Sequence, residues 1–331
     1  MTEQRIIRPN GGHIILPKRF IDVGIPVNPV SMKGRYQLVK RDAYGIELER
    51  TPWFDNLLLT SGLNRMGTAS TILGAAIGTD ATAPNAAQTG LIVQSIYTTT
   101  TGAGHGVIAA LGVSPYNNTA TYVYRTALGA LNGNYSEVGV GWLSGAMFSR
   151  ALILNGVGSP TSISVTSAQQ LDIIYQLSVY PPLVDTSAVV TISGVNYTVT
   201  GRAASVNGTT LWNPSRFTNS FVYCSSSAYV GAVYTGAIGA ITSVPAGTSA
   251  ISTDRGISDA YVNNSLQRTG YNSYGLTAGN VAGGIKSTLI SWNEDTGNSG
   301  AYFQYGFNPV IPKDGTKTLV LHYSLNWAAR P

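Results

Sequence analysis

Residues 169–180 read QQLDIIYQLSVY, and this stretch is the clearest structural signal in the chain. Successive side chains of a strand point to opposite faces, so a period of two predicts a half-buried β-strand. Only Ile174 interrupts the polar face, and Pro181 and Pro182 end the run. The apolar face carries five side chains: Leu171, Ile173, Tyr175, Leu177 and Val179.

The same alternation recurs toward the C-terminus, in TKTLVLHYSLNW at residues 316–327. Residues 188–202, AVVTISGVNYTVTGR, predict a hairpin that turns near Ser193–Asn196. Strands separated by Gly, Asn and Pro turns are typical of all-β folds. The sequence therefore predicts a mainly β chain with an antiparallel, jelly-roll-like β-sandwich body. Further strands are expected at residues 72–78, 91–97 and 119–127, and the apolar face near the C-terminus carries Leu319, Leu321, Tyr323, Leu325 and Trp327.

The N-terminal part has a different character. Residues 1–34 are punctuated by Pro and Gly, which predicts an extended arm that lies on a neighbour. In residues 35–51, RYQLVKRDAYGIELERT, apolar and charged or polar residues alternate on either side of a turn, which predicts a mostly exposed β-hairpin. Residues 53–68, WFDNLLLTSGLNRMGT, predict one short helix, capped by Asp55 or Asn56 and closed by Gly67.

These patterns suggest two parts. We expect residues 1–66 to form a docking part with the arm, hairpin and helix, and residues 67–331 to form the sandwich body. Residues 203–285 are rich in Ser, Gly, Ala, Thr and Tyr and alternate only weakly. This region is interpreted as an extension of the sandwich, an insertion or an adaptable contact surface, because Tyr, Ser and Gly suit such surfaces.

Charge is scarce in this chain. Only 11% of the residues are charged, against about 25% in an ordinary soluble domain. Cores of protein interfaces are depleted in Lys, Glu and Asp and enriched in Tyr and Trp. The composition therefore favours contacts with other subunits and a homo-oligomer. Of the net charge of +5, residues 1–65 carry +4. Acids interleave with these bases and no basic run is interspersed with aromatic residues, so no nucleic-acid partner is expected.

The sequence offers little catalytic chemistry. Cys224 is the only cysteine, and His13, His105 and His322 match no metal-binding spacing. Glu294 and Asp295 are adjacent, and neighbours on a strand point to opposite faces, which disfavours a glycosidase pair unless they lie in a loop. We therefore expect no enzyme activity and no catalytic, cofactor or metal site. No apolar run of about 18 residues occurs, so no membrane span is expected.

Residues 134–153, NYSEVGVGWLSGAMFSRALI, raise the alternative of an active-site rim. Gly139 and Gly141 fall on one face of a strand, which permits a bulge or the close approach of another chain. Trp142 would fill the space beside them, and Arg150 would hydrogen-bond carbonyls or a carboxylate at the sheet edge. We interpret the stretch as a scaffold, and Trp53 and Trp327 as further core or interface residues.

The same stretch carries a resemblance to a known group of proteins. Together with TSISVTSAQQLDIIYQLSVYPP it resembles a pattern in structural proteins of tailed bacteriophages. WFDNLLLTSGLNRMG, GAAIGTDATAPNAAQTGL and VIPKDGTKTLVLHYSLNWAAR resemble other segments of that family. The resemblance covers roughly residues 53–202 and 300–331.

The resemblance implies a virion component without catalytic activity, assembled in the cytoplasm of a bacterial host. It implies partners among other virion proteins and favours a place in the tail, as a fibre, baseplate or collar protein docked through its N-terminal arm. Two alternatives stay open: a head decoration or neck protein, and a receptor-binding module that recognises a host surface glycan.

Overall fold

The computed structural model describes residues 29–208 except Ser193, and residues 211–218, 231–252, 260–293 and 300–331. Between and before these ranges it describes the backbone of five short strands. They are β1 (Ile6–Ile7), β2 (His13–Ile14), β3 (Gly24–Ile25), β19 (Tyr223–Cys224) and β22 (Asp254–Ile257). The chain is mainly β with several antiparallel sheets, which confirms the predicted fold class. Neither helix among the described residues is long and apolar enough to cross a membrane.

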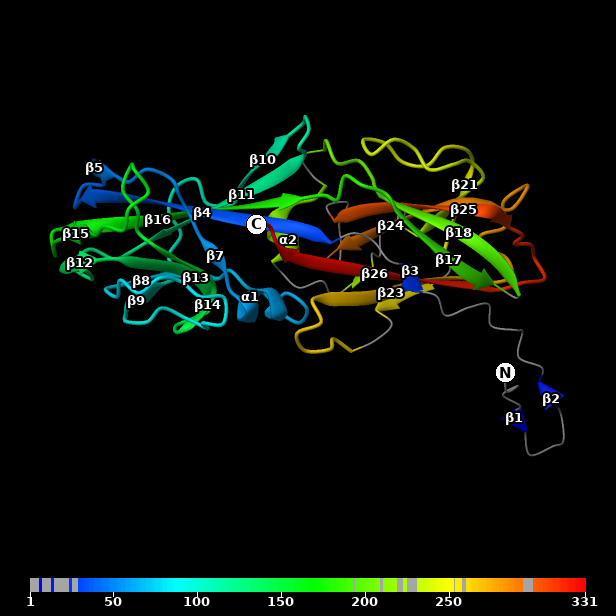
Figure 1. Cartoon of the computed structure of the whole chain (residues 1–331), viewed down its shortest axis with the longest axis horizontal. Coiled ribbons are helices and arrows are strands. Elements are labelled where there is room, and N and C mark those ends of the chain that lie inside the picture. The colour runs from blue at the N-terminus through cyan, green and yellow to red at the C-terminus, as the bar shows by residue number, and fades with distance from the viewer. Residues whose placement is uncertain are drawn as a thin grey trace.

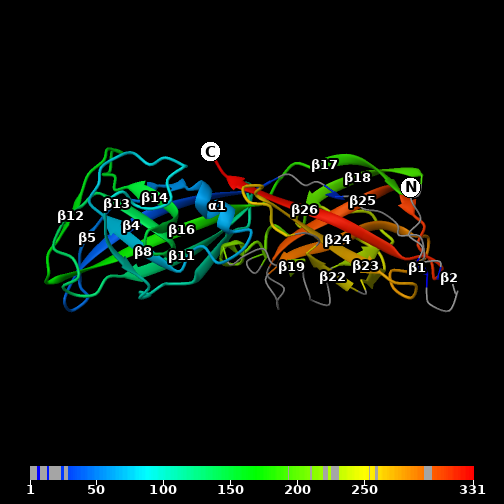
Figure 2. The same ribbon diagram turned by 90° about the horizontal axis from the view of Figure 1, so that it is seen from below.

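Two β-sandwiches lie end to end, as the turned view in Figure 2 shows. The first contains one layer in the order β10-β11-β16-β4, with β5 and β6 also paired to β4. These strands are β4 (Val30–Asp42), β5 (Glu47–Arg50), β6 (Phe54–Asp55), β10 (Val107–Leu111), β11 (Asn117–Arg125) and β16 (Gln169–Tyr180).

The facing layer of the first sandwich has the order β7-β14-β13-β8-β9, and β12 pairs with β15 separately. These strands are β7 (Leu57–Leu58), β8 (Gly74–Gly78), β9 (Gln94–Thr98), β12 (Gly133–Tyr135), β13 (Glu137–Leu143), β14 (Ala146–Leu152) and β15 (Ile163–Val165). The layers meet in the core: the hydroxyl oxygens of Tyr36 on β4 and Ser149 on β14 lie 2.6 Å apart.

The second sandwich lies on the right in Figure 1, beside the first. One layer has the order β17-β18-β25-β24-β20-β21 with β19 on β24, and the other contains β26, β23 and β22. The Tyr305 and Tyr323 rings, one from each layer, lie 4.9 Å apart between centroids. The strands are β17 (Thr186–Ile192), β18 (Val195–Ala203), β20 (Ala232–Tyr234), β21 (Ser249–Ile251), β23 (Gln267–Tyr274), β24 (Ile285–Asn293), β25 (Ala301–Ile311) and β26 (Leu319–Ala329).

One parallel contact joins the two sandwiches. The end of β26 pairs with the start of β4, with Trp327 opposite Val30 and Ala329 opposite Met32. β3 pairs with the same edge of β26 nearer to the start of that strand, with Gly24 opposite His322. The first and last long strands of the chain therefore lie side by side at the middle of the molecule (Figure 1).

The helix α1 (Thr60–Arg65) strengthens this junction. The indole Nε1 of Trp327 donates to the Leu63 carbonyl oxygen at 2.8 Å. Tyr261 stacks on Trp327 with centroids 6.0 Å apart and donates to Asn64 Oδ1 at 2.9 Å. The second helix, α2 (Pro214–Phe217), lies against β11 and β16, and the carbonyl of Thr218 directly after it accepts from the Thr71 amide at 2.8 Å.

The alternating segments form strands as predicted. β16 covers residues 169–180, and all five apolar side chains of its predicted core face are fully buried. The five on β26 are buried as well, and residues 188–202 form the β17–β18 hairpin. Burial of one whole face is what fixes such strands in register.

The predicted helix at residues 53–68 is mostly wrong. Short strands β6 and β7 occupy its first half, and α1 has only six residues. Leu59 is the N-cap and makes no side-chain cap hydrogen bond, so neither Asp55 nor Asn56 caps the helix. The strands prevail because Tyr36 on β4 and Arg150 on β14 offer pairing partners to Phe54 and Leu57.

Residues 30–66, which the sequence assigns to a docking part, lie within the first sandwich. β4 is paired along both edges, and Val30, Met32 and Tyr36 are fully buried, so the hairpin is exposed mainly along β5 and at its turn, where Tyr44 is 91% exposed. The side chains of the arm before residue 29 lie outside the described residues. In the region 203–285, β20, β21 and β23 are strands of the second sandwich.

Candidate interaction surface

Gly139 and Gly141 in the β13–β14 hairpin make room for the backbone of the same chain. The β13–β14 ladder is irregular on both sides of Gly141, as a bulge requires. A Cβ at Gly141 would lie 2.1 Å from the Ala146 carbonyl oxygen, and one at Gly139 would lie 3.0 Å from the Ser149 carbonyl oxygen. The close approach that the glycines permit is therefore that of β14, the partner strand in the same chain.

Arg150 is fully buried between charged and polar partners. Its Nε donates to Glu137 Oε2 at 2.8 Å, and both side chains have no exposed surface. Nη1 donates to Gln88 Oε1 and Nη2 to the Thr82 carbonyl oxygen, each at 2.8 Å. Arg150 thus binds a carboxylate and a carbonyl, and it fixes the loop before β9 onto the sheet.

The three predicted tryptophans lie in three separate places. Trp327 is buried at the junction of the sandwiches. Trp53 and Trp142 are half-buried, and each ring is covered by an arginine: the guanidinium carbon of Arg35 lies 4.5 Å from the Trp53 centroid, and that of Arg65 lies 4.7 Å from the Trp142 centroid. In each case the cation–π contact with the arginine covers one face of the indole ring. Gly139, Gly141, Trp142 and Arg150 share one hairpin, whereas Trp53 and Trp327 lie elsewhere.

A charged cluster ties three strands together on the outer face of the first sandwich. Asp172 on β16 accepts from Arg41 Nε on β4 at 2.6 Å and from Arg125 Nε on β11 at 2.6 Å. Burial raises the pKa of Asp172, but the hydrogen bonds from Arg125 and Arg41 outweigh burial and hold it below its ordinary value. We call these three residues the Asp172 clamp.

The residues considered for catalysis stay apart where they are described. His105 Nδ1 lies 3.0 Å from the Val123 carbonyl oxygen, and His322 lies on β26 in the other sandwich. Glu294 and Asp295 lie outside the described residues. Among the residues that the structure describes, no three His, Cys, Asp or Glu side chains gather in a way that could hold a metal ion.

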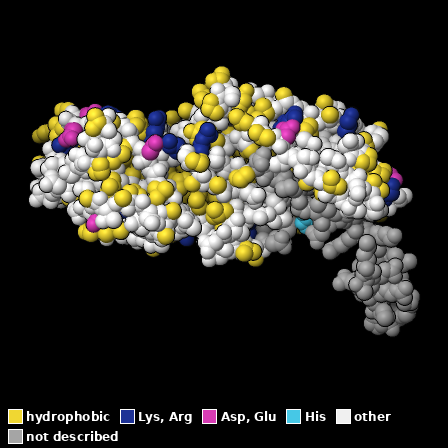
Figure 3. Space-filling view, viewed as in Figure 1, with side chains coloured by type: hydrophobic (Ala, Val, Ile, Leu, Met, Phe, Trp, Pro, Cys, Tyr) yellow, Lys and Arg dark blue, Asp and Glu magenta, His cyan; other side chains and the backbone are white. Residues whose placement is uncertain are grey.

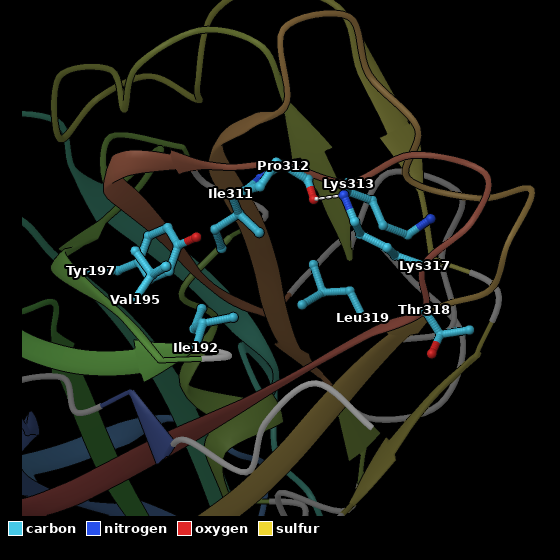
Figure 4. A pocket seen from close by; sticks show the side chains of 9 residues that line it. All are labelled: Ile192, Val195, Tyr197, Ile311, Pro312, Lys313, Lys317, Thr318 and Leu319. Atoms are coloured by element: carbon cyan, nitrogen blue, oxygen red, sulfur yellow. Dashed lines mark hydrogen bonds between the residues drawn. The ribbon is translucent and has the colours of Figure 1, made fainter. Parts of the chain in front are cut away.

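An apolar pocket of about 220 Å³ opens at the far end of the second sandwich (Figure 4). Ile192, Ile311 and Leu319 point toward one another inside it, from β17, β25 and β26. At its rim Lys313 donates to Gly275 O and Asn280 Oδ1, and Lys317 binds Asp314 at 2.8 Å. Burial lowers the pKa of Lys313. The two ammonium groups are thus bound by the protein, and the pocket suits a small apolar group.

An exposed apolar surface lies on the β10–β11 hairpin. Val107, Leu111 and Val113 are 55%, 43% and 63% exposed, and Ala109 between them is exposed as well. We call these four residues the β10 surface. Figure 3 shows hydrophobic side chains gathered on this hairpin, which projects from the top of the molecule. Among the strands that the structure describes, β10 is the last of its layer and pairs only with β11.

The β10 surface lies within a long stretch of sequence that has no charged residues. The 44 residues from Ala81 to Tyr124 contain no Lys, Arg, Asp or Glu. This uncharged run is the sequence signal that points to the β10 surface, which no single motif indicates. An exposed apolar strand edge without charges is a surface that proteins normally cover.

The chain was compared with known proteins at three levels. No protein-family model, no curated protein and no solved structure matches it.

Proposed function

We propose that this protein is a non-enzymatic structural component of a tailed-phage virion and that it belongs to the tail, as a fibre, baseplate or collar protein. The observation that carries the proposal is the β10 surface, an uncharged apolar strand edge on an otherwise well-packed molecule. A subunit that works inside an assembly has such edges covered by its neighbours.

Two further observations support the proposal. The resemblance to phage structural proteins rests on segments that form β8, β13, β14, β16 and β26, all of them scaffold strands. In addition, the backbone of Gly24–Ile25 adds to the edge of β26 by parallel pairing. An arm held by backbone pairing is a common way to link subunits, because strand addition needs few side-chain contacts.

The test is a cryo-EM reconstruction of the particle in which this chain is traced. Density at the baseplate, fibre or collar supports the proposal and identifies the partners of the arm. Density on the capsid replaces it with a head-decoration role. Density at the distal tip, with a loss of host adsorption after changes in residues 203–285, favours the receptor-binding role. Absence of the chain from the particle overturns the proposal.

A further inference from the structure

We propose that two copies of this chain pair through β10, antiparallel to each other, about a two-fold axis that passes beside Ala109. The four-stranded layer β10-β11-β16-β4 would then continue across the axis into the same layer of the second copy. The inference rests on the strand edge and does not depend on the virion assignment.

The first argument is the open backbone edge. β10 has five residues in regular register with β11, from Val107 opposite Thr121 to Leu111 opposite Asn117. Its other edge has no strand beside it among the described residues. Natural edge strands are protected by Lys, Pro or a bulge, and residues 107–111, VIAAL, contain neither Lys nor Pro and show no register shift. The edge is therefore competent to accept another strand.

The second argument concerns the identity of that strand. A two-fold interface places every residue near its own copy, so each charge would meet a like charge. The uncharged run from Ala81 to Tyr124 meets this requirement, in a protein whose net charge of +5 otherwise makes copies repel one another. A partner chosen by charge would instead require charges on this surface. The missing charge therefore points to a second copy of the chain.

The third argument is the register. With the axis beside Ala109, all five residues of β10 pair, and Val107 lies opposite Leu111 of the second copy. Facing residues of an antiparallel pair share one face of the sheet. The exposed residues Val107, Ala109 and Leu111 would thus cover their counterparts, and the small Ala109 side chains meet where the strands cross. Ile108 and Ala110 stay on the core side, where Ile108 already packs.

The expected dimer is reversible. Stable interfaces bury about 1,200–2,000 Å² in total, and a five-residue strand pair alone provides less. Val113 and Tyr116 in the hairpin turn lie next to β10 and extend the contact. We therefore expect dimerisation to depend on protein concentration, and to be strengthened where copies are held together in an assembly.

Cysteine cross-linking tests the register. In Ala109→Cys, the two cysteines of the dimer face each other within the roughly 7 Å between Cα atoms that a disulfide tolerates. We expect a disulfide-linked dimer after mild oxidation. Thr119→Cys is the matched control: Thr119 lies on the same face, opposite Ala109 on β11, so its two copies are separated by two further strand spacings of about 4.8 Å each. The native chain, with Cys224 alone, gives the background.

Sedimentation equilibrium of the full chain tests the interface without a covalent link. Ala109→Lys places two like charges at the axis and is expected to abolish dimerisation while the circular dichroism spectrum stays native. Val189→Lys, at an exposed apolar position on β17, should dimerise like the native chain. The proposal is overturned if the native chain stays monomeric at millimolar concentration, or if Ala109→Cys cross-links no faster than Thr119→Cys. Either result leaves the virion assignment untouched, because that is decided by the particle reconstruction.

Discussion

At the residue scale, Arg150 and Glu137 show how a buried charge is retained in a β-sandwich. Glu137 accepts from Arg150 and also from the amides of Ile92 and Val93 at 3.1 and 2.8 Å. Every charged atom therefore has a partner, as a buried ion pair requires. The pair holds the loop that leads into β9 against β13.

Removal of one partner should be costly. Arg150→Met leaves the carboxylate of Glu137 buried without its cation, and we expect a loss of about 3–5 kcal/mol in the free energy of unfolding. The double variant Glu137→Gln/Arg150→Met keeps the acceptor for the Val93 amide and removes the charge, so it should be more stable than Arg150→Met alone. Urea unfolding of the native protein, the single variant and the double variant measures these differences in the free energy of unfolding. Equal stability of the single and double variants would contradict the role of charge.

Gly141 offers a second test. A Cβ there would collide with the Ala146 carbonyl oxygen at 2.1 Å and with Met147 Cα at 2.6 Å, so β14 must shift. We expect Gly141→Ala to cost about 1–3 kcal/mol, as overpacking does. Gly156→Ala is the control, because a Cβ at Gly156 meets nothing within 4 Å and its φ is not positive. Thermal unfolding monitored by circular dichroism distinguishes the two, and a similar midpoint for both would exclude the steric explanation.

The sequence allowed part of the residue-scale site to be predicted. The glycines and Arg150 stand close together in sequence, so a bulge and a carboxylate partner could be inferred from local pattern. The Asp172 clamp could not, because Arg41 and Asp172 are 131 positions apart and meet only through the β4–β16 pairing. The β10 surface depends on which strand ends its layer, which no local pattern specifies.

At the element scale, the Asp172 clamp connects β4, β16 and β11 across the outer face of one layer. Opposite-charge pairs between strands stabilise a sheet. Asp172 is 3% exposed, whereas the arginines are partly exposed, so the carboxylate is the member that burial penalises most. The clamp therefore makes the sheet sensitive to acid.

The pH dependence follows from the lowered pKa of Asp172. A carboxyl group whose pKa is depressed in the folded state stabilises the fold above its unfolded value of about 3.9, and this contribution is lost as the pH falls through the folded value. At pH 7, Asp172→Asn should be less stable by about 1.5–3 kcal/mol, as for hydrogen bonds to charged groups. Urea unfolding from pH 7 to pH 3 should show this difference shrinking below about pH 4. A difference that stays constant over this range would assign the effect to shape and not to charge.

Element types were predictable where one face is buried and regular. One face of β16 and one face of β26 are apolar at every second residue, and both strands were located to within three residues, because burial of one face imposes the period. The segment 53–68 was not predictable in this way, since Leu57 and Leu58 satisfy a helical and an extended pattern equally well. Pairing of β7 with β14, distant in sequence, decided between them.

At the scale of the whole molecule, the start of β4 belongs to the core. Val30 and Met32 are fully buried and pair with the end of β26. The division of the chain into two sandwiches escapes sequence analysis, because β26 returns from the second half to meet a strand from the beginning. Such a contact between distant segments leaves no local trace.

Truncation tests this arrangement. Deletion of residues 1–23 keeps β3 and every described strand after it, so the thermal midpoint should stay close to that of the full chain. Deletion of residues 1–34 removes Val30 and Met32, and loss of a buried Met side chain alone costs about 2–5 kcal/mol. A stable 35–331 fragment would show that the start of β4 is dispensable. Under the proposed function, the 24–331 fragment folds but is not incorporated into particles.

The parallel contact between β4 and β26 also determines how the molecule bears load. The chain enters at the start of β4 and leaves at the end of β26, and these two strands point the same way. Tension between residues 29 and 331 therefore pulls the two strands in opposite directions along their length. The hydrogen bonds between β4 and β26 are therefore loaded in shear and must break together, instead of one after another. This short parallel ladder should resist mechanical unfolding at the junction of the two sandwiches.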